Sequence, residues 1–174
     1  MAVLREAPGT WSVEEVELDD PKYGEVLVEM VATGLCHSDD HISHGDAQVA
    51  HLPVVGGHEG AGIVRKLGPG VVDFEVGDHV LTSFIPACGK CRWCSMGMQN
   101  LCDNGAKIMI GDQMDGTFRA HDDKGTDIAT AGLLGTFAEW QVYDQLSLIK
   151  VDKDLPLDVI CLVACGVQTG FGSA

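Results

Sequence analysis

The chain has 174 residues, of which 45% are hydrophobic and 21% are charged, as in an ordinary globular protein with one core. Its formal charge of −15 argues against nucleic acid or an anionic membrane as a partner, because phosphate groups require a basic surface. Residues 1–20 contain no apolar run, and no stretch approaches the roughly 18 apolar residues of a membrane span, so we expect a cytoplasmic protein.

The chain is predicted to be mainly β with short helices. Apolar and polar residues alternate in several short segments that are separated by Gly, Pro and Asp, which is typical of half-buried strands joined by tight turns. These predicted strands are 13–18, 25–30, 62–68, 74–84 and 137–143. A short helical turn is expected at 38–45.

The last third of the chain gives weaker signals. Residues 103–135 are rich in Gly and Asp and show no period, so they are predicted to form a long loop. Pro156 is a typical start for a short helix. We expect that helix to break near Cys165 and Gly166, after which a second helix begins.

Four of the seven cysteines lie close together, as Cys88, Cys91, Cys94 and Cys102. Their spacing is C-x2-C-x2-C-x7-C, and four thiolates with no open position suit a structural zinc ion. An iron–sulfur cluster is the main alternative, but ferredoxin motifs have a shorter last gap that is followed by proline. Here the gap is seven residues and Asp103 follows, which favours zinc.

A second ligand set is spread along the chain. Cys36, His58 and Cys165 together would provide two thiolates and one imidazole, which is a ligand set of catalytic zinc with a fourth position open. Spacing alone does not join residues so far apart. Taken singly, Cys165 is better explained as a small buried apolar residue, and His58 as a hydrogen-bonded core or turn histidine.

Four motifs resemble one known family in the same order. The segment GHEGAGIVRKLGPGV, residues 57–71, resembles the zinc signature of the medium-chain alcohol dehydrogenases. CHSDDH at 36–41, the four-cysteine segment and CGVQTGFGSA at 165–174 are similar to the same family. The resemblance runs from about residue 10 to the end and is interrupted only at 103–135. The flanks of the cysteine cluster resemble the actinobacterial branch that is assayed with nitroso-aniline acceptors.

The resemblance implies a fold and a domain organisation. Residues 1–174 would form a GroES-like zinc-binding catalytic domain, a partly open β-barrel with a structural-zinc lobe at about 86–103. The family's Rossmann domain begins within a few tens of residues after the last motif, with its own glycine-rich phosphate turn. Gly166, Gly170 and Gly172 do not supply that turn, so we expect the dinucleotide-binding domain to be absent from this chain.

The resemblance also implies roles around the second ligand set. Cys36, His58 and Cys165 would bind the catalytic zinc, and Glu59 would approach the metal during ligand exchange. Asp39 would hydrogen-bond the zinc-bound histidine and fix its tautomer. Without the resemblance, Asp39 is explained as a helix cap and Glu59 as a buried, hydrogen-bonded acid.

Further residues would handle the proton, the cofactor and the substrate. By resemblance, Ser38 would take the substrate proton and His41 would pass it to solvent. His37 would face the cofactor pyrophosphate, and Thr169 would lie beside the nicotinamide. Phe84 would line the substrate pocket, although a core phenylalanine is an equally ordinary interpretation. The remaining residues of interest are Leu133 and Leu134 (further pocket candidates), His44, His51 and His121 (surface), and Cys161 (core).

The function implied is that of a zinc-dependent alcohol dehydrogenase, which interconverts a small alcohol and an aldehyde or ketone with NAD(P). Two zinc ions per chain, inactivity of residues 1–174 alone and a homo-oligomer of the full-length form are expected. The alternative is a non-enzymatic zinc-binding structural module. The zinc-free quinone reductase branch fits poorly, because it lacks both cysteine sets.

Overall fold

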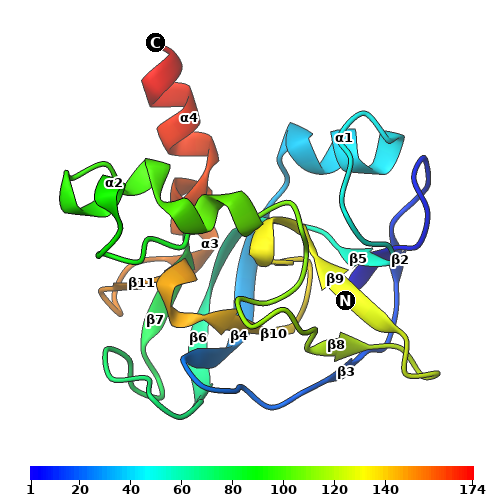
Figure 1. The fold of residues 1–174 in the computed structure, drawn as a ribbon, viewed down its shortest axis with the longest axis horizontal. Helices are drawn as coiled ribbons and strands as arrows, with labels where there is room; N and C mark the ends of the chain where they lie inside the picture. The colour runs from blue at the N-terminus through cyan, green and yellow to red at the C-terminus, as the bar shows by residue number, and fades with distance from the viewer.

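The computed structural model describes all 174 residues, which form two β-sheets with short helices around them (Figure 1). The six-stranded sheet has the order β2-β1-β5-β9-β8-β3, and the five-stranded sheet has the order β10-β4-β6-β7-β11. The strands of the first sheet are β1 (Ala2–Leu4), β2 (Ser12–Val13), β3 (Glu17–Leu18), β5 (Val54–Val55), β8 (Ala120–His121) and β9 (Asp127–Thr130). Those of the second are β4 (Glu25–Gly34), β6 (Glu59–Leu67), β7 (His79–Thr82), β10 (Trp140–Asp144) and β11 (Leu148–Val151).

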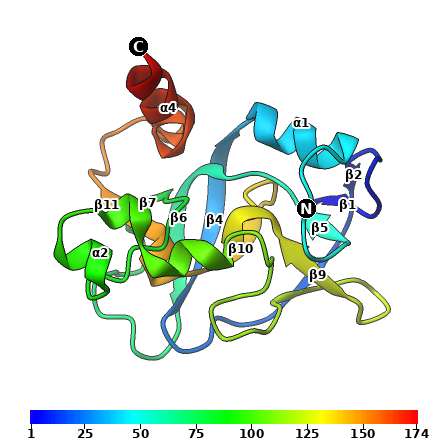
Figure 2. The same cartoon turned by 45° about the horizontal axis from the view of Figure 1, so that its top comes forward.

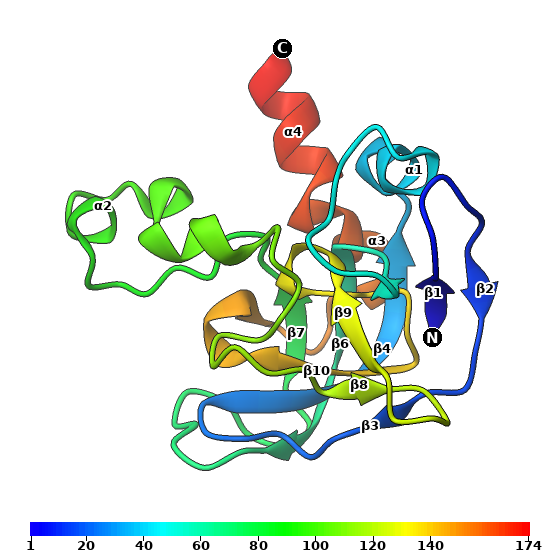
Figure 3. The same cartoon turned by 45° about the vertical axis from the view of Figure 1, so that its right-hand side comes forward.

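The helices are short and lie at the ends and edges of the sheets. The α-helices are α1 (His37–His44), α2 (Arg92–Ser95), α3 (Leu157–Ile160) and α4 (Gly166–Ser173). The 3₁₀ helices are η1 (Gln99–Leu101), η2 (Asp103–Lys107), η3 (Ala131–Leu133), η4 (Gln145–Ser147) and η5 (Cys161–Ala164). Figure 3 shows the α2 region projecting from one side as a separate lobe, and α4 leads away from the sheets to the C-terminus. No helix has the length and apolar character needed to cross a membrane.

All strand pairs are antiparallel except β5 with β9, which pair in parallel over two residues each. Residues 1–174 therefore contain no parallel β-α-β unit of the kind that binds dinucleotides. This agrees with the prediction that the chain is mainly β.

The largest core cluster follows from the alternation in β4. Val26 and Val28 point into this cluster, where they meet Val64 of β6 and Tyr143 of β10. A second cluster lies beneath α1, which contributes Ile42 as its one buried aliphatic side chain. Burial of these side chains stabilises each sheet by roughly 25 cal/mol per Å² of apolar surface removed from water.

A buried ion pair joins the two sheets. Arg119, which precedes β8, donates from Nε and Nη2 to the two carboxylate oxygens of Glu25 at the start of β4, at 2.8 and 2.6 Å. The Arg119 side chain is 1% exposed and also donates to Asp115 at 2.8 Å. Such a bidentate, fully hydrogen-bonded pair fixes the relative position of the sheets, since neither charge has access to water.

Two predictions about the fold are wrong. Residues 13–18 do not form one half-buried strand, because β2 pairs with β1 and β3 pairs with β8, and Val13 is 90% exposed. Residues 103–135 are not a loop, because they contain η2, β8, β9, η3 and the buried Arg119. Strands of two to four residues between glycine turns are too short to show a period of two.

Other elements agree with the predictions. β4 covers the predicted strand at 25–30, and β6 covers the predicted strand at 62–68 up to Leu67. α1 covers the predicted helical turn at 38–45 up to His44. Only 79–82 of the predicted strand 74–84 is extended, and the predicted strand 137–143 begins at Trp140. The predicted break before the last helix is present at Cys165, whose φ of −145° and ψ of −62° separate η5 from α4.

Candidate functional site

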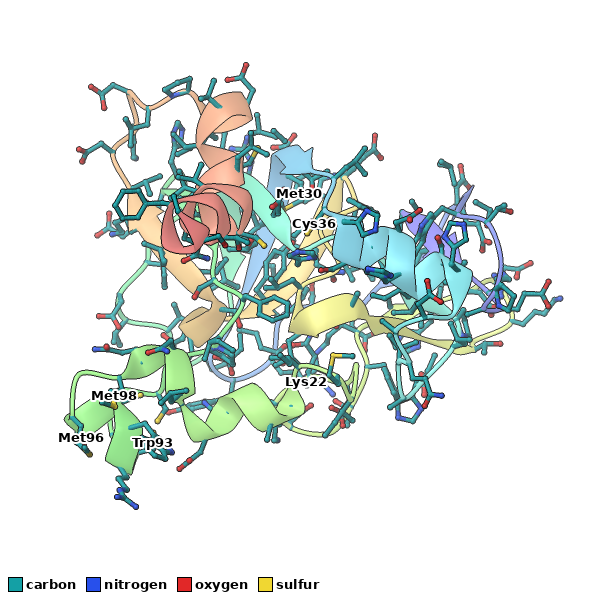
Figure 4. All side chains as sticks on the ribbon, turned by 90° about the horizontal axis from the view of Figure 1, so that it is seen from above. Lys22, Met30, Cys36, Trp93, Met96 and Met98 are labelled. Atoms are coloured by element: carbon teal, nitrogen blue, oxygen red, sulfur yellow. The ribbon has the colours of Figure 1, made fainter.

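Three separate parts of the chain meet at one point. Cys36 precedes α1, His58 precedes β6, which begins at Glu59, and Cys165 lies between η5 and α4. One ligand atom of each of these four residues lies within 4.8 Å of those of the others. Figure 4 shows Cys36 in the space between α4 and α1. The sequence-predicted ligands Cys36, His58 and Cys165 are therefore brought together.

Asp39 contacts both the Cys36 segment and the His58 segment of this cluster. Its Oδ2 accepts a hydrogen bond from the backbone N–H of Cys36 at 3.2 Å, which caps the N-terminus of α1. Its Oδ1 accepts from the N–H of Gly57 at 3.1 Å and lies 3.4 Å from Nδ1 of His58. Asp39 thus serves both as a helix cap and as the carboxylate beside the histidine, and it turns Nε2 of His58 toward the two thiols.

Glu59 is a carboxylate with an unusual environment. It is 3% exposed and accepts no hydrogen bond from the protein. Its oxygens lie against Gly34 and Gly166, where a Cβ atom at Gly34 would collide with the carboxylate. A nearby cation would stabilise the charged form of a buried carboxylate that lies beside two thiols and an imidazole. Zn²⁺ takes these donor types, so the residues present fit the metal.

The protonation equilibria of the cluster follow from burial and mutual contact. Burial alone would raise the pKa of the Cys36 thiol, but the N–H and hydroxyl of Ser38 and the imidazole of His58 bring that pKa below its ordinary value. Burial alone would lower the pKa of His58, but Asp39 and Cys36 raise it. Burial raises the pKa of the Cys165 thiol, which Thr169 partly counteracts. A divalent cation among these groups would favour both thiolates and the neutral imidazole.

A cavity of about 380 Å³ opens beside the cluster. The Phe84 ring forms one wall and meets the His58 ring edge-on, with centroids 5.4 Å apart. The hydroxyls of Ser38 and Thr169 lie 3.6 and 3.7 Å from the sulfur atoms of Cys36 and Cys165. The lining residues are Ser38, His58, Phe84, Ala164, Cys165, Gln168 and Thr169.

A larger groove of about 1060 Å³ lies elsewhere, between the β2–β3 segment, the second half of β4 and residues 136–140. Its lining is apolar with five carboxylates at Glu14, Glu15, Glu17, Asp123 and Glu139, and it contains no histidine or cysteine. The smaller cavity beside the cluster is therefore the better candidate for chemistry.

Some predicted site residues lie away from the cavity. His37 and His41 are exposed on α1 with ring centroids 4.5 Å apart, and His41 Nδ1 lies 3.4 Å from Asp46. Leu133 and Leu134 do not line the cavity, because both are buried in the protein core, Leu134 within the main cluster. Leu133 has a φ of 63°, which is rare for a residue other than glycine.

The four-cysteine lobe forms a compact cluster of its own. The sulfur atoms of Cys88, Cys91, Cys94 and Cys102 lie within 4.8 Å of one another, and those of Cys91 and Cys102 are 3.9 Å apart. Backbone N–H groups of Cys94 and Asp103 lower the pKa of the Cys91 thiol to about 6. Gly89 and Gly97 have φ values of 72° and 78°, so glycine is required at both turns. Four sulfur donors from one short segment also fit Zn²⁺.

Two residues that the sequence analysis missed support the cluster of Cys36, His58 and Cys165. The buried Thr82 hydroxyl accepts from the N–H of Gly60 at 2.9 Å and lies 3.2 Å from the His58 carbonyl, which fixes the start of β6. Gln168 donates to the carbonyl of Ala164 at 2.6 Å and lines the cavity. Gln168 lies in the motif CGVQTGFGSA, which the sequence analysis quoted without assigning a role to this residue. No sequence pattern marks Thr82.

Comparison with known proteins places this geometry in a family. The family model described as "Alcohol dehydrogenase GroES-like domain" matches residues 22–153. This chain belongs to that family. Its two sheets are the partly open β-barrel that the resemblance implied.

Individual relatives match over almost the whole chain. Alcohol dehydrogenase B of Mycobacterium tuberculosis is 50% identical over 174 residues, and the NDMA-dependent alcohol dehydrogenase of Amycolatopsis methanolica is 51% identical over 173 residues. A crystal structure of an alcohol dehydrogenase zinc-binding domain protein from Burkholderia ambifaria superposes with a TM-score of 0.91 at 36% identity. Each match covers 99% of this chain and 46% of the relative, so the chain spans less than half the length of these proteins.

Proposed function

We propose that residues 1–174 are the zinc-binding catalytic domain of an alcohol dehydrogenase that interconverts a small alcohol and an aldehyde or ketone. The observation that carries this proposal is the convergence of Cys36, His58, Glu59 and Cys165 beside a cavity lined by Ser38, Phe84 and Thr169. Two thiolates, one imidazole and an adjacent open cavity are the features that separate a catalytic zinc site from a structural one.

Two groups that bind to the protein would provide the redox chemistry. Zn²⁺ at this site supplies Lewis acidity, and a nicotinamide cofactor supplies the hydride acceptor. Cys36, His58 and Cys165 would hold the metal, and Cys88, Cys91, Cys94 and Cys102 would hold a second, structural zinc ion in the lobe at 86–103. NAD(P) would bind mainly to a dinucleotide-binding domain outside residues 1–174, with contacts from His37 and Thr169.

The protein's own residues orient the substrate and move its proton. Ser38, at the cavity wall, is placed to accept the hydroxyl proton of an alcohol, and exposed His41 would pass it to solvent. Asp39 keeps the proton of His58 on Nδ1, so that Nε2 stays available to a cation. Phe84 closes one side of the cavity against water. Buried Glu59, next to the ligand cluster, would approach the metal during ligand exchange.

Several apolar side chains near the C-terminal end of the chain are exposed to solvent. α3, η5 and α4 expose Val159, Leu162, Val163, Val167 and Phe171, the last at 87%. We infer that further protein covers this face, either the cofactor domain or another subunit of a homo-oligomer.

Seven free cysteines, which need reducing conditions to keep their thiols, support a cytoplasmic location. NDMA is the acceptor we select for assays of the full-length protein, after the relative named for it.

Cobalt substitution distinguishes a catalytic zinc site from a purely structural module. Co²⁺ replaces Zn²⁺ at both clusters, and its visible bands report changes in the ligand sphere. We expect the bands to shift on addition of a small alcohol or aldehyde. The shift should be lost in Cys165→Ser and kept in Cys161→Ser, a matched control because Cys161 is a buried cysteine outside both clusters. If no alcohol or aldehyde shifts the visible bands of bound Co²⁺, the non-enzymatic structural module becomes the better description.

A further inference from the structure

Helix α1 concentrates histidine on the outside of the molecule. His37, His41 and His44 are three of the chain's seven histidines, and all three are exposed. Figure 2 shows α1 on the outer side of the molecule, near β1 and β2. His37 and His41 are four residues apart, so they share one helix face, and their ring centroids are 4.5 Å apart. Two histidines at this spacing can chelate a transition-metal cation.

The other ring nitrogens of two of these histidines are already occupied. His41 Nδ1 lies 3.4 Å from Oδ2 of Asp46. His44 Nδ1 lies 3.0 Å from the carbonyl oxygen of Asp40 and 3.3 Å from its carboxylate. Metal-binding histidines commonly make this contact through the nitrogen that does not ligate, because it fixes the tautomer and raises the basicity of the ring. In both residues Nε2 remains the free ligand atom.

The electrostatic environment favours a cation. Asp46 lies beside His41 and Asp40 beside His44, and the whole chain has a formal charge of −15. His37 makes no hydrogen bond within the protein, so its ring can turn toward His41 without breaking a contact. Imidazole donors select Ni²⁺, Cu²⁺ and Zn²⁺ over Mg²⁺ and Ca²⁺.

We infer that the exposed face of α1 is a third cation site, with Nε2 of His37 and His41 as its ligands, Asp46 as a positioning residue and water completing the coordination. The site is distinct from both thiolate clusters, since it contains no sulfur donor. Its consequence rests on the proposed function. A cation on Nε2 of His41 would remove the atom that passes the substrate proton to solvent, so excess transition metal would inhibit the full-length enzyme.

The test is isothermal titration calorimetry with Ni²⁺ alone, on chain that has been loaded with zinc and then freed of excess and weakly bound metal, so that the α1 site is empty. We expect one further Ni²⁺ per chain. His37→Gln and His41→Gln should each weaken its binding by at least about tenfold, and Asp46→Asn by less. His51→Gln is the matched control, because His51 is exposed but outside α1, and it should bind Ni²⁺ as the wild type does. The zinc content of each variant must stay that of the wild type, which shows that the clusters remain intact.

Three results would overturn the inference: no further Ni²⁺ in the wild type, unchanged affinity in either His37→Gln or His41→Gln, or equal loss in His51→Gln. Electron paramagnetic resonance with Cu²⁺ gives an independent readout. Hyperfine coupling to two imidazole nitrogens, falling to one in either variant, supports the site. None of these measurements depends on the outcome at Cys36 and Cys165, so the proposed function and this site can fail separately.

Discussion

The two thiolate clusters of this protein are assembled in opposite ways. The lobe takes Cys88, Cys91, Cys94 and Cys102 from fifteen consecutive residues, and its turns depend on local glycines. The second cluster takes Cys36, His58 and Cys165 from a helix cap, a strand start and an inter-helix break. The first needs little beyond its own segment and a metal. The second exists only when the two sheets and the last helices are correctly placed.

The largest expected effect is on the lobe when metal is removed. Within residues 88–102 only Cys94 and Cys102 are buried, and Met96, Met98 and Leu101 are exposed. Figure 4 shows Trp93, Met96 and Met98 at the outer end of the lobe. Binding of a structural zinc ion contributes on the order of 10 kcal/mol to such a segment. A chelator, or Cys91→Ser, should therefore allow trypsin to cleave after Lys90 and Arg92. A metal-free lobe as resistant as the zinc form would contradict this.

The next largest effect should follow from breaking the buried ion pair between the sheets, and its effect on zinc binding should be confined to the second cluster. Arg119→Ala leaves Glu25 as an uncompensated buried charge between the sheets, which costs about 3–5 kcal/mol. We expect urea unfolding at lower concentration and weaker zinc binding at Cys36, His58 and Cys165, with zinc retained in the lobe. Arg65→Ala removes an exposed arginine paired with Glu29 and is the matched control. Equal zinc loss from both clusters would contradict the claim that only the second cluster depends on the placement of the sheets.

A smaller effect is expected at Asp39. Asp39→Asn weakens the contact to Nδ1 of His58 and should lower the zinc affinity of the second cluster by roughly 10- to 100-fold. Asp40→Asn changes the neighbouring exposed carboxylate and should leave that affinity unchanged. Competition with a chromophoric chelator measures both. If the two variants bind zinc equally well, Asp39 caps α1 but does not contribute to zinc affinity through His58.

The smallest effect concerns acid stability of the sheet that carries neither cluster. The N–H groups of Thr126 and Lys124, together with Arg5, lower the pKa of Asp122 to about 2. A carboxyl group whose folded-state pKa is depressed stabilises the fold above its unfolded pKa of about 4 and loses that contribution as pH falls toward 2. Asp122→Asn should therefore flatten the dependence of unfolding free energy on pH between about 4 and 2. An unchanged slope would show that Asp122 is not the titrating group.

The same contrast explains what could be predicted from the sequence. The lobe was predicted from spacing, because all four ligands and both glycines are local. The second cluster was predicted only through resemblance, since no period connects Cys36 with Cys165. Its supports were missed for the same reason: Thr82 acts through a hydroxyl in a short strand, and Arg119 lies in a segment of glycine turns.

The fold shows a similar division. β4 and β6 are nine or more residues long, so their alternation is visible in the sequence. β2, β3 and β8 have two residues each and take their conformation from their partners across the sheet. Tertiary pairing decides such strands, which is why the segments 13–18 and 103–135 were predicted wrongly.

The most direct test of the central claim is zinc content per chain, measured by elemental analysis. The wild type and Cys161→Ser should each hold two zinc ions, and Cys36→Ser combined with Cys165→Ser should hold one. That result would show that ligands from three distant elements bind a second metal. One zinc ion per chain in all three proteins would contradict the claim, because only the lobe would then be a metal site.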